Sequence, residues 1–152
     1  MPRPNGIPIL LQHGFQGDSG NFVYGGPDDG LGFVLYDMGF DVYLGNGRGN
    51  TYSRKHQTMS PEEDKFWHWS FQEMASFDFP AMVEQVVVIS GAEKIWFIGY
   101  SEGAMIAHLV RLCNDKNCYL DVILNMPKES LLKNPLLRSL RLRLLSILLQ
   151  LF

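Results

Sequence analysis

The sequence predicts an α/β fold, a mainly parallel sheet flanked by helices, on three observations. Short and almost wholly apolar runs stop at glycine or histidine, which is typical of strands buried on both faces. Segments with apolar residues at helical spacing lie between these runs. Strands that alternate with helices in this way form βαβ units with parallel strands. With 152 residues, 46% apolar and 19% charged, the chain is long enough for one domain with a core.

The first half of the chain supplies two predicted strands and one helix. We predict a strand over residues 7–12, a loop over the glycine-rich residues 17–32, and a helix over residues 31–38 that ends at Gly39. The second strand covers residues 40–44. It is stopped by residues 45–50, GNGRGN, because glycine and asparagine tolerate positive φ.

The second half supplies a helix start, two further helices and two further strands. Ser60 suits a helix cap, Pro61 the first helical position, and two acids follow in the first turn, so we predict that a helix begins here. A helix over residues 79–90 ends at Gly91. A third strand over residues 95–98, a helix over residues 102–112 and a fourth strand over residues 120–124 complete the prediction.

Charge divides the chain into two predicted regions. Residues 1–127 carry 8 basic and 15 acidic side chains, whereas residues 128–152 carry 5 basic side chains and 1 acidic one. We therefore predict a partial α/β core over residues 1–127 and a basic, leucine-rich tail over residues 128–152. The net charge of −3 gives no reason to expect nucleic acid as a partner. We expect no signal peptide, because the apolar stretch at the N-terminus is short and broken by Pro8.

The two cysteines point to neither a metal site nor a settled disulfide. Cys113 and Cys118 lie five positions apart at the end of a predicted helix. We favour two ordinary thiols, with a disulfide that closes a very small loop as the alternative. Two cysteines alone cannot form a structural zinc site, so we predict no metal.

A nucleophile motif lies between the third strand and its helix. The run Gly99-Tyr100-Ser101-Glu102-Gly103 is a G-x-S-x-G sequence, which at a strand-to-helix turn is typical of the nucleophile elbow. There the serine takes a strained conformation above the sheet, and the helix N-terminus directs free N–H groups toward the acyl oxyanion. The bare pattern arises easily by chance, but the apolar strand before it and the apolar-faced helix after it favour Ser101 as a nucleophile.

A second motif, His13-Gly14-Phe15, follows the first strand. On its own it reads as a plain turn that ends a strand. Paired with the downstream elbow, it predicts an oxyanion hole, because a loop at this position supplies one N–H and the residue after the nucleophile supplies the other. The predicted donors are the backbone N–H groups of Phe15 and Glu102.

These motifs and the sequence around them resemble the acid lipase family, which includes the gastric and lysosomal acid lipases and related steryl ester hydrolases. The likeness runs from about residue 8 to about residue 108, and the run GN-x-RGN-x-x-SRKH is the most distinctive part. The matching runs are residues 12–14 (QHG), 39–46 (GFDVYLGN), 48–51 (RGNT), 53–56 (SRKH), 73–75 (EMA) and 78–81 (DFPA).

The resemblance implies an α/β-hydrolase core with a Ser-Asp-His triad that acts on neutral lipid esters, such as triacylglycerols or steryl esters, without a metal or organic cofactor. By position, Ser101 is the nucleophile, and Phe15 and Glu102 are the oxyanion donors. The family's elbow usually reads GHSQG, whereas this one reads GYSEG. Tyr100 should be tolerated because that position mostly packs. An ionised Glu102 would oppose a developing oxyanion, which lowers activity or shifts its pH dependence toward acid.

The triad aspartate and histidine are expected to be absent from this chain. They follow the serine in the order Ser, Asp, His, yet the only later histidine is His108, about 10 Å up the same helix. A general base must lie within hydrogen-bond reach of the serine. We interpret His13, His56 and His68 as structural, and Asp115 and Asp121 lack a histidine to orient. The sequence therefore predicts a partial fold, truncated at both ends, without the later strands and the cap.

Three functional interpretations remain open at this stage. The first is a carboxylic ester hydrolase of neutral lipids, present as a fragment that is inactive or very weak. The second is a non-catalytic lipid- or partner-binding remnant, and the third is a different ester or thioester hydrolase on the same fold. Residues 131–152 would allow weak contact with a membrane surface, although we favour an unrelated end that packs loosely. The family is secreted or lysosomal, and the compartment of this chain is left open.

Overall fold

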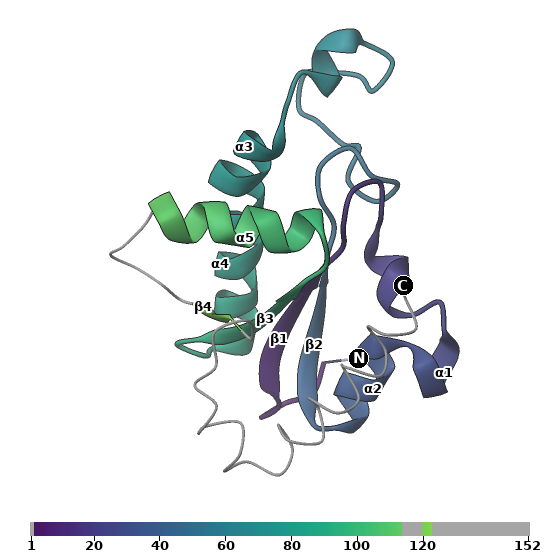
Figure 1. The fold of residues 1–152 in the computed structure, drawn as a ribbon, viewed down its shortest axis with the longest axis vertical. Coiled ribbons are helices and arrows are strands. Elements are labelled where there is room, and N and C mark those ends of the chain that lie inside the picture. The colour runs from purple at the N-terminus through teal and green to yellow at the C-terminus, as the bar shows by residue number, and fades with distance from the viewer. Residues whose placement is uncertain (1, 114–119, 123–152) are drawn as a thin grey trace. The chain divides into compact units, whose positions relative to one another are not determined.

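A four-stranded sheet forms the centre of the structure, a computed structural model in which residues 2–113 and 120–122 are described (Figure 1). Its order is β2-β1-β3-β4, and β1 pairs in parallel with both β2 and β3. The first three strands confirm the predictions, and β4 does so over the residues described. The strands are β1 (Ile7–Gln12), β2 (Phe40–Gly45), β3 (Ile95–Gly99) and β4 (Leu120–Val122).

Helices cover both faces of the sheet. In Figure 1, α1 (Gly26–Asp29) and α2 (Leu31–Asp37) lie on one side, and α4 (Phe79–Ser90) and α5 (Glu102–Cys113) lie on the other. The ends predicted for α2 and α4 are confirmed: Gly39 and Gly91, which follow them, have φ of +99° and +68°. The α/β class with a partial, mainly parallel sheet is therefore confirmed.

The core lies where α4 packs on the sheet. Phe79, Val83 and Val86 are buried and recur at helical spacing, so they form one face of α4. The Phe79 ring meets the Phe97 ring of β3 edge to face, with centroids 4.9 Å apart. Ile9 and the two leucines that follow it in β1 are almost wholly inaccessible to solvent. This packing holds β1 and β3 in place, and the loops that follow these two strands carry the candidate site described below.

The glycine-rich residues 17–32 are not all loop, and that prediction is wrong. They contain the 3-10 helix η1 (Ser19–Phe22), the whole of α1 and the first two residues of α2. The Asp18 carboxylate accepts the Gly20 N–H at 2.7 Å, and the Asn21 side chain accepts the Asp18 N–H at 3.1 Å. This reciprocal cap nucleates a turn that glycine content alone does not predict.

The helix predicted to begin at Ser60 also does not form. The Ser60 hydroxyl accepts the Glu62 N–H at 3.3 Å, but the chain makes only a turn. The Pro61 carbonyl, which a helix would use for its own ladder, accepts instead from the Trp67 indole N–H at 2.8 Å. Only the 3-10 helix η2 (Asp64–Trp67) follows.

The helix predicted over residues 79–90 begins earlier than expected. A capping box between Ser70 and Glu73 starts α3 (Phe71–Glu73), and the chain continues without a break through a π-helical turn, η3 (Met74–Asp78), into α4. Hydrogen bonds from the Ser70 hydroxyl and backbone N–H hold the pKa of Glu73 below its usual range. A π turn contains one residue more than an α turn, which the periodicity of apolar residues does not reveal.

Several predictions concern residues outside those described. The Cys113–Cys118 question, Asp115 and the tail over residues 128–152, with its contact to a membrane surface, all depend on such residues. The division after residue 127 therefore stays a prediction. None of the helices among the described residues is long and apolar enough to cross a bilayer.

Candidate active site

Three loops leave the same edge of the sheet. Because the register pairs Gln12 with both Gly45 and Gly99, the parallel strands β1, β2 and β3 end level with one another. The first loop begins at His13, the second at Asn46 and the third contains Ser101. In α/β sheets this carboxyl edge is where ligands bind, so the fold brings together all three sequence motifs.

Ser101 lies in the strained conformation that its motif predicts. Its φ is +50°, in the left-handed region that residues other than glycine rarely adopt, and its side chain is exposed. The Gly103 N–H donates to the Tyr100 carbonyl at 2.9 Å, and the Met105 N–H donates to the Ser101 carbonyl at 3.1 Å. The serine therefore occupies a tight turn between β3 and the first turn of α5.

Two glycines allow the first loop to lie directly against this turn. A Cβ on Gly14 would lie 3.0 Å from the Ser101 Cβ and 2.9 Å from the Tyr100 ring. A Cβ on Gly103 would lie 2.6 Å from the Gln12 carbonyl oxygen, closer than real Cβ contacts come. The Tyr100 N–H also donates to that carbonyl at 3.0 Å. Glycine is therefore required at both positions by contact distance.

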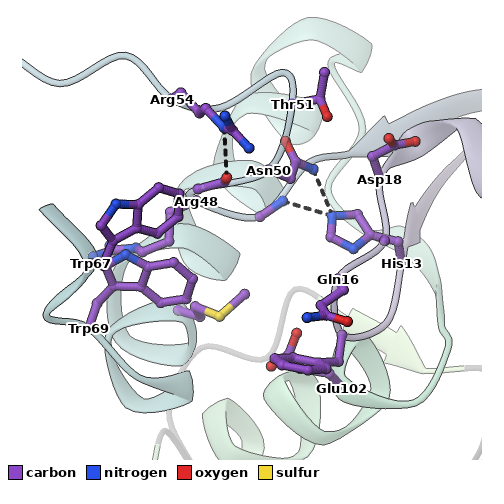
Figure 2. A pocket seen from close by; sticks show the side chains of 15 residues that line it. His13, Gln16, Asp18, Arg48, Asn50, Thr51, Arg54, Trp67, Trp69 and Glu102 are labelled. Carbon is purple, nitrogen blue, oxygen red and sulfur yellow. Dashed lines mark hydrogen bonds between the residues drawn. The ribbon is translucent and has the colours of Figure 1, made fainter. Parts of the chain in front are cut away.

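Phe15 and Glu102, the two residues predicted as oxyanion donors, line one pocket of about 510 Å³. The Phe15 side chain is 73% exposed, and Glu102 is the first residue of α5. In Figure 2 the side chains of His13, Gln16 and Glu102 lie on one side of the pocket, opposite two tryptophans. The lining consists of His13, Phe15, Gln16, Gly17, Asp18, Gly47, Arg48, Gly49, Asn50, Thr51, Arg54, Trp67, Trp69, Met74 and Glu102.

The far wall of the pocket is aromatic, and the sequence did not assign it a role. The Trp67 and Trp69 rings lie 6.5 Å apart and tilted by 36°. Arg54 lies over the Trp67 ring at 5.8 Å and donates to the Gly49 carbonyl at 3.2 Å. Met74, from the π turn, also lines the pocket. The cluster of aromatic residues near residue 67 is the signal that could have predicted it.

An ion pair ties the second loop to the helix that carries Met74. The Arg48 Nε lies 2.8 Å and 3.0 Å from the two carboxylate oxygens of Asp78, and Nη2 lies 2.5 Å from one of them. This hydrogen bonding raises the pKa of the Arg48 guanidinium. Because the fork is bidentate, it sets the direction of the loop as well as its position.

His13 is buried and joined to the second loop. Its Nε2 lies 3.0 Å from the Gly47 amide nitrogen and 3.1 Å from the Asn50 side-chain nitrogen, and its Nδ1 lies 2.8 Å from the Gly14 carbonyl oxygen. Elsewhere, the His56 Nδ1 accepts the backbone N–H groups of residues 58 and 59. Within residues 2–113 no hydrogen bond joins the Ser101 side chain to a histidine.

The described residues offer no grouping suited to a metal. No three side chains of His, Cys, Asp or Glu gather closely enough to hold an ion within residues 2–113 and 120–122.

Comparison with known proteins identifies the family of this chain. Residues 7–117 match the model of a protein family described as the alpha/beta hydrolase fold. The match covers both the first motif and the elbow. The chain therefore belongs to the α/β-hydrolase fold family.

Curated relatives narrow this to the acid lipase type. Lipase member M of Mus musculus is 50% identical over 95 residues, which are 62% of this chain and 22% of the relative. The human lysosomal acid lipase/cholesteryl ester hydrolase is 45% identical over 108 residues, 71% of this chain and 26% of the relative. Lipase 1 of Drosophila melanogaster is 40% identical over 119 residues, 78% of this chain and 27% of the relative. The chain spans about a quarter of the length of these relatives.

Proposed function

We propose that this chain carries the nucleophile and the oxyanion hole of a carboxylic ester hydrolase that acts on neutral lipid esters. Ser101 is the nucleophile, and the backbone N–H groups of Phe15 and Glu102 bind the oxyanion. The observation that carries the proposal is the strained φ of +50° at Ser101, in a turn against which Gly14 packs. Strained non-glycine residues cluster at active sites, and Ser101 lies at the carboxyl edge of a parallel sheet, where ligands bind.

The position of the pocket supports the proposal that the substrate has an apolar part. Phe15 and Glu102 belong to both the proposed oxyanion hole and the pocket lining, so a group bound in the pocket would adjoin the reacting carbonyl. Its volume of about 510 Å³ is suited to a small molecule or part of a lipid. We propose that Trp67, Trp69 and Met74 contact the apolar part of the ester.

The relatives support the same chemical class. One of them is named as an acid lipase and cholesteryl ester hydrolase, and the others listed above are named as lipases. Neutral lipid esters such as triacylglycerols and steryl esters are therefore the proposed substrates.

None of the chain's four histidines is the general base in this proposal. His13 uses both ring nitrogens in hydrogen bonds to the backbone and to Asn50. His108 is exposed on α5, about 10 Å along the axis from Ser101. Hydrolysis by this chain is therefore expected to be slow, at the level that an oxyanion hole supports without a triad.

Labelling with a fluorophosphonate tests the proposal. The reagent is incubated with the folded chain, and mass spectrometry identifies the modified peptide. We expect slow but selective modification of Ser101, because the oxyanion hole stabilises the charge that develops on the phosphoryl oxygen. The label should disappear in Ser101→Ala and persist in His108→Ala.

Ser60→Ala is the matched control, because Ser60 is exposed and lies in a turn far along the chain from the elbow. It should label at the wild-type rate. Absence of labelling in a sample whose circular dichroism and unfolding transition are those of a folded protein would contradict the proposal. That result would favour a non-catalytic lipid-binding role for the pocket instead.

A further inference from the structure

The second loop is connected to the proposed oxyanion hole by a chain of neutral hydrogen bonds through His13. The proton positions in this series of hydrogen bonds can be assigned, because some of its groups can only donate and others can only accept. A backbone N–H can only donate, and a carbonyl can only accept. The Gly47 N–H points at His13 Nε2 at 3.0 Å, so Nε2 must be the acceptor. The proton of the neutral ring then lies on Nδ1, which donates to the Gly14 carbonyl at 2.8 Å.

The asparagine side chains are fixed by the same reasoning. The Asn50 carbonyl oxygen accepts the Tyr52 N–H at 3.0 Å, so its amide nitrogen faces the other way. That nitrogen lies 3.1 Å from His13 Nε2 and 2.9 Å from the Asn46 side-chain oxygen. The same Asn46 oxygen accepts the Ser19 N–H at 3.0 Å. These hydrogen bonds fix the amide orientations of Asn46 and Asn50.

The orientation matters because of the geometry of a peptide. The Gly14 carbonyl and the Phe15 N–H belong to one peptide unit, and the described chain has no cis peptide bond. In a trans peptide the C=O and N–H point in opposite directions. Two donors hold the Gly14 carbonyl, the His13 ring at 2.8 Å and the Gly17 N–H at 3.0 Å. Holding the carbonyl on that side directs the Phe15 N–H to the opposite side.

We propose that His13, held in its Nδ1–H tautomer by Gly47 and Asn50, is a positioning residue that directs the Phe15 N–H into the oxyanion hole. This inference rests on the proposed function for the identity of that N–H as an oxyanion donor. It gives a role to the GN-x-RGN run, whose residues 46, 47 and 50 contact His13 or one another. Although His13 lines the pocket, it is 4% exposed, and in this account it acts through the peptide rather than on the substrate.

Two substitutions of His13 separate positioning from general stability. The side-chain nitrogen of His13→Asn can occupy the position of Nδ1 and donate to the Gly14 carbonyl, whereas His13→Ala offers no donor there. Both variants lose the contacts of Nε2 with the second loop equally. A merely structural role therefore predicts similar behaviour for the two, and a positioning role predicts that asparagine rescues.

The first measurement does not depend on activity. A long-range nitrogen–proton spectrum of the labelled chain should show the His13 ring as the Nδ1–H tautomer. The carbonyl carbon shift of Gly14 should stay close to the wild-type value in His13→Asn and move in His13→Ala. The Nε2–H tautomer, or equal Gly14 shifts in the two variants, would overturn the inference.

The second measurement is the rate at which the fluorophosphonate labels Ser101. His13→Ala should reduce this rate on the order of 100-fold, as the loss of one oxyanion donor does, and His13→Asn by less than about tenfold. Asn50→Ala, which removes one of the two donors to Nε2, should cost less than His13→Ala. Equal rates in the two His13 variants, at matched unfolding midpoints, would contradict the positioning role. A wild-type chain that never labels would instead contradict the proposed function, and the spectra would still decide the tautomer.

Discussion

The two ends of the same sheet are held by polar groups of different kinds. At the amino end, the buried carboxylate of Asp41 accepts the Arg3 N–H at 3.0 Å and the Tyr43 hydroxyl at 2.6 Å. At the carboxyl end, His13 and the two asparagines form a network without a net charge. A carboxylate accepts from a wide range of directions, whereas a neutral imidazole has one donor and one acceptor at fixed positions. We therefore expect the Asp41 network to contribute mainly to stability and the His13 network to set an orientation.

The largest expected effect on stability comes from adding a Cβ at Gly103, where the elbow lies against the first loop. Gly103→Ala would place a Cβ against the backbone carbonyls of Gln12 and His13, at 2.6 Å and 2.7 Å. Because neither atom is the flexible end of a side chain, we expect a loss of about 3 kcal/mol in the free energy of unfolding. Denaturant unfolding measures it.

Gly91→Ala is the matched control for that substitution. Gly91 has a positive φ, but a Cβ there would meet nothing within 4 Å. The loss should therefore be about 1 kcal/mol, the cost of the left-handed conformation alone. Equal losses at the two glycines would show that the close approach of the first loop to the elbow is not rigid.

An intermediate effect is expected at the amino end. Asp41→Asn weakens the acceptor of the Arg3 and Tyr43 hydrogen bonds, so unfolding should become easier by about 1–2 kcal/mol. The rate of Ser101 labelling should stay unchanged, because this network does not reach the loops. A labelling rate that falls in parallel with stability would remove the distinction between the two ends.

The same variant has a signature at high pH. Burial, together with the hydrogen bond to Asp41, raises the pKa of Tyr43 from 10.0 to about 12. A pKa raised in the folded state gives stability that is present below pH 10 and is lost as pH rises through 12. In Asp41→Asn the pKa of Tyr43 should fall part of the way back, since burial remains. Nuclear magnetic resonance titration of the Tyr43 ring measures the change.

The smallest effect concerns the one carboxylate in the elbow. Glu102→Gln keeps the backbone N–H but removes a negative charge beside the proposed oxyanion. We expect Ser101 labelling to become about threefold faster at neutral pH, because a partly exposed charge acts weakly through water. The labelling rate is measured from acid to neutral pH. If neither the rate nor its pH profile changes, the side chain of Glu102 does not affect the oxyanion hole.

The sequence predicted the framework because the framework depends on local patterns. Mainly apolar runs of four to six residues predicted β1 to β3, and the motif around Ser101 predicted the turn that the structure confirms as strained. The roles of Ser101, Phe15 and Glu102 themselves stay predictions. The local pattern at Ser60 gave a wrong prediction: the cap sequence starts no helix, and the Trp67 indole N–H donates to the Pro61 carbonyl. A favourable cap sequence does not produce a helix where a backbone carbonyl accepts a hydrogen bond from a side chain instead of from the helix.

The network around His13 could not be predicted, for a different reason. Its hydrogen bonds join residues 34 and 37 positions apart, and nothing in the local sequence gives their direction. The run GN-x-RGN predicted only a turn that ends the second strand, because glycine and asparagine tolerate positive φ. The Arg48–Asp78 pair likewise spans 30 positions. Such contacts become predictable only once the register of the parallel strands is known.

The π turn between α3 and α4 sets which side chains face the pocket. Its extra residue offsets the helix before it from the helix after it by about 100° around the common axis. Phe79, Val83 and Val86 are buried on one face of α4, whereas Met74, from the same continuous helix, lines the pocket. A chain one residue shorter at this point would turn Met74 by that angle relative to α4 and present a different side chain to the pocket. The shape of the pocket thus depends on the number of residues in the π turn as well as on which residues line it.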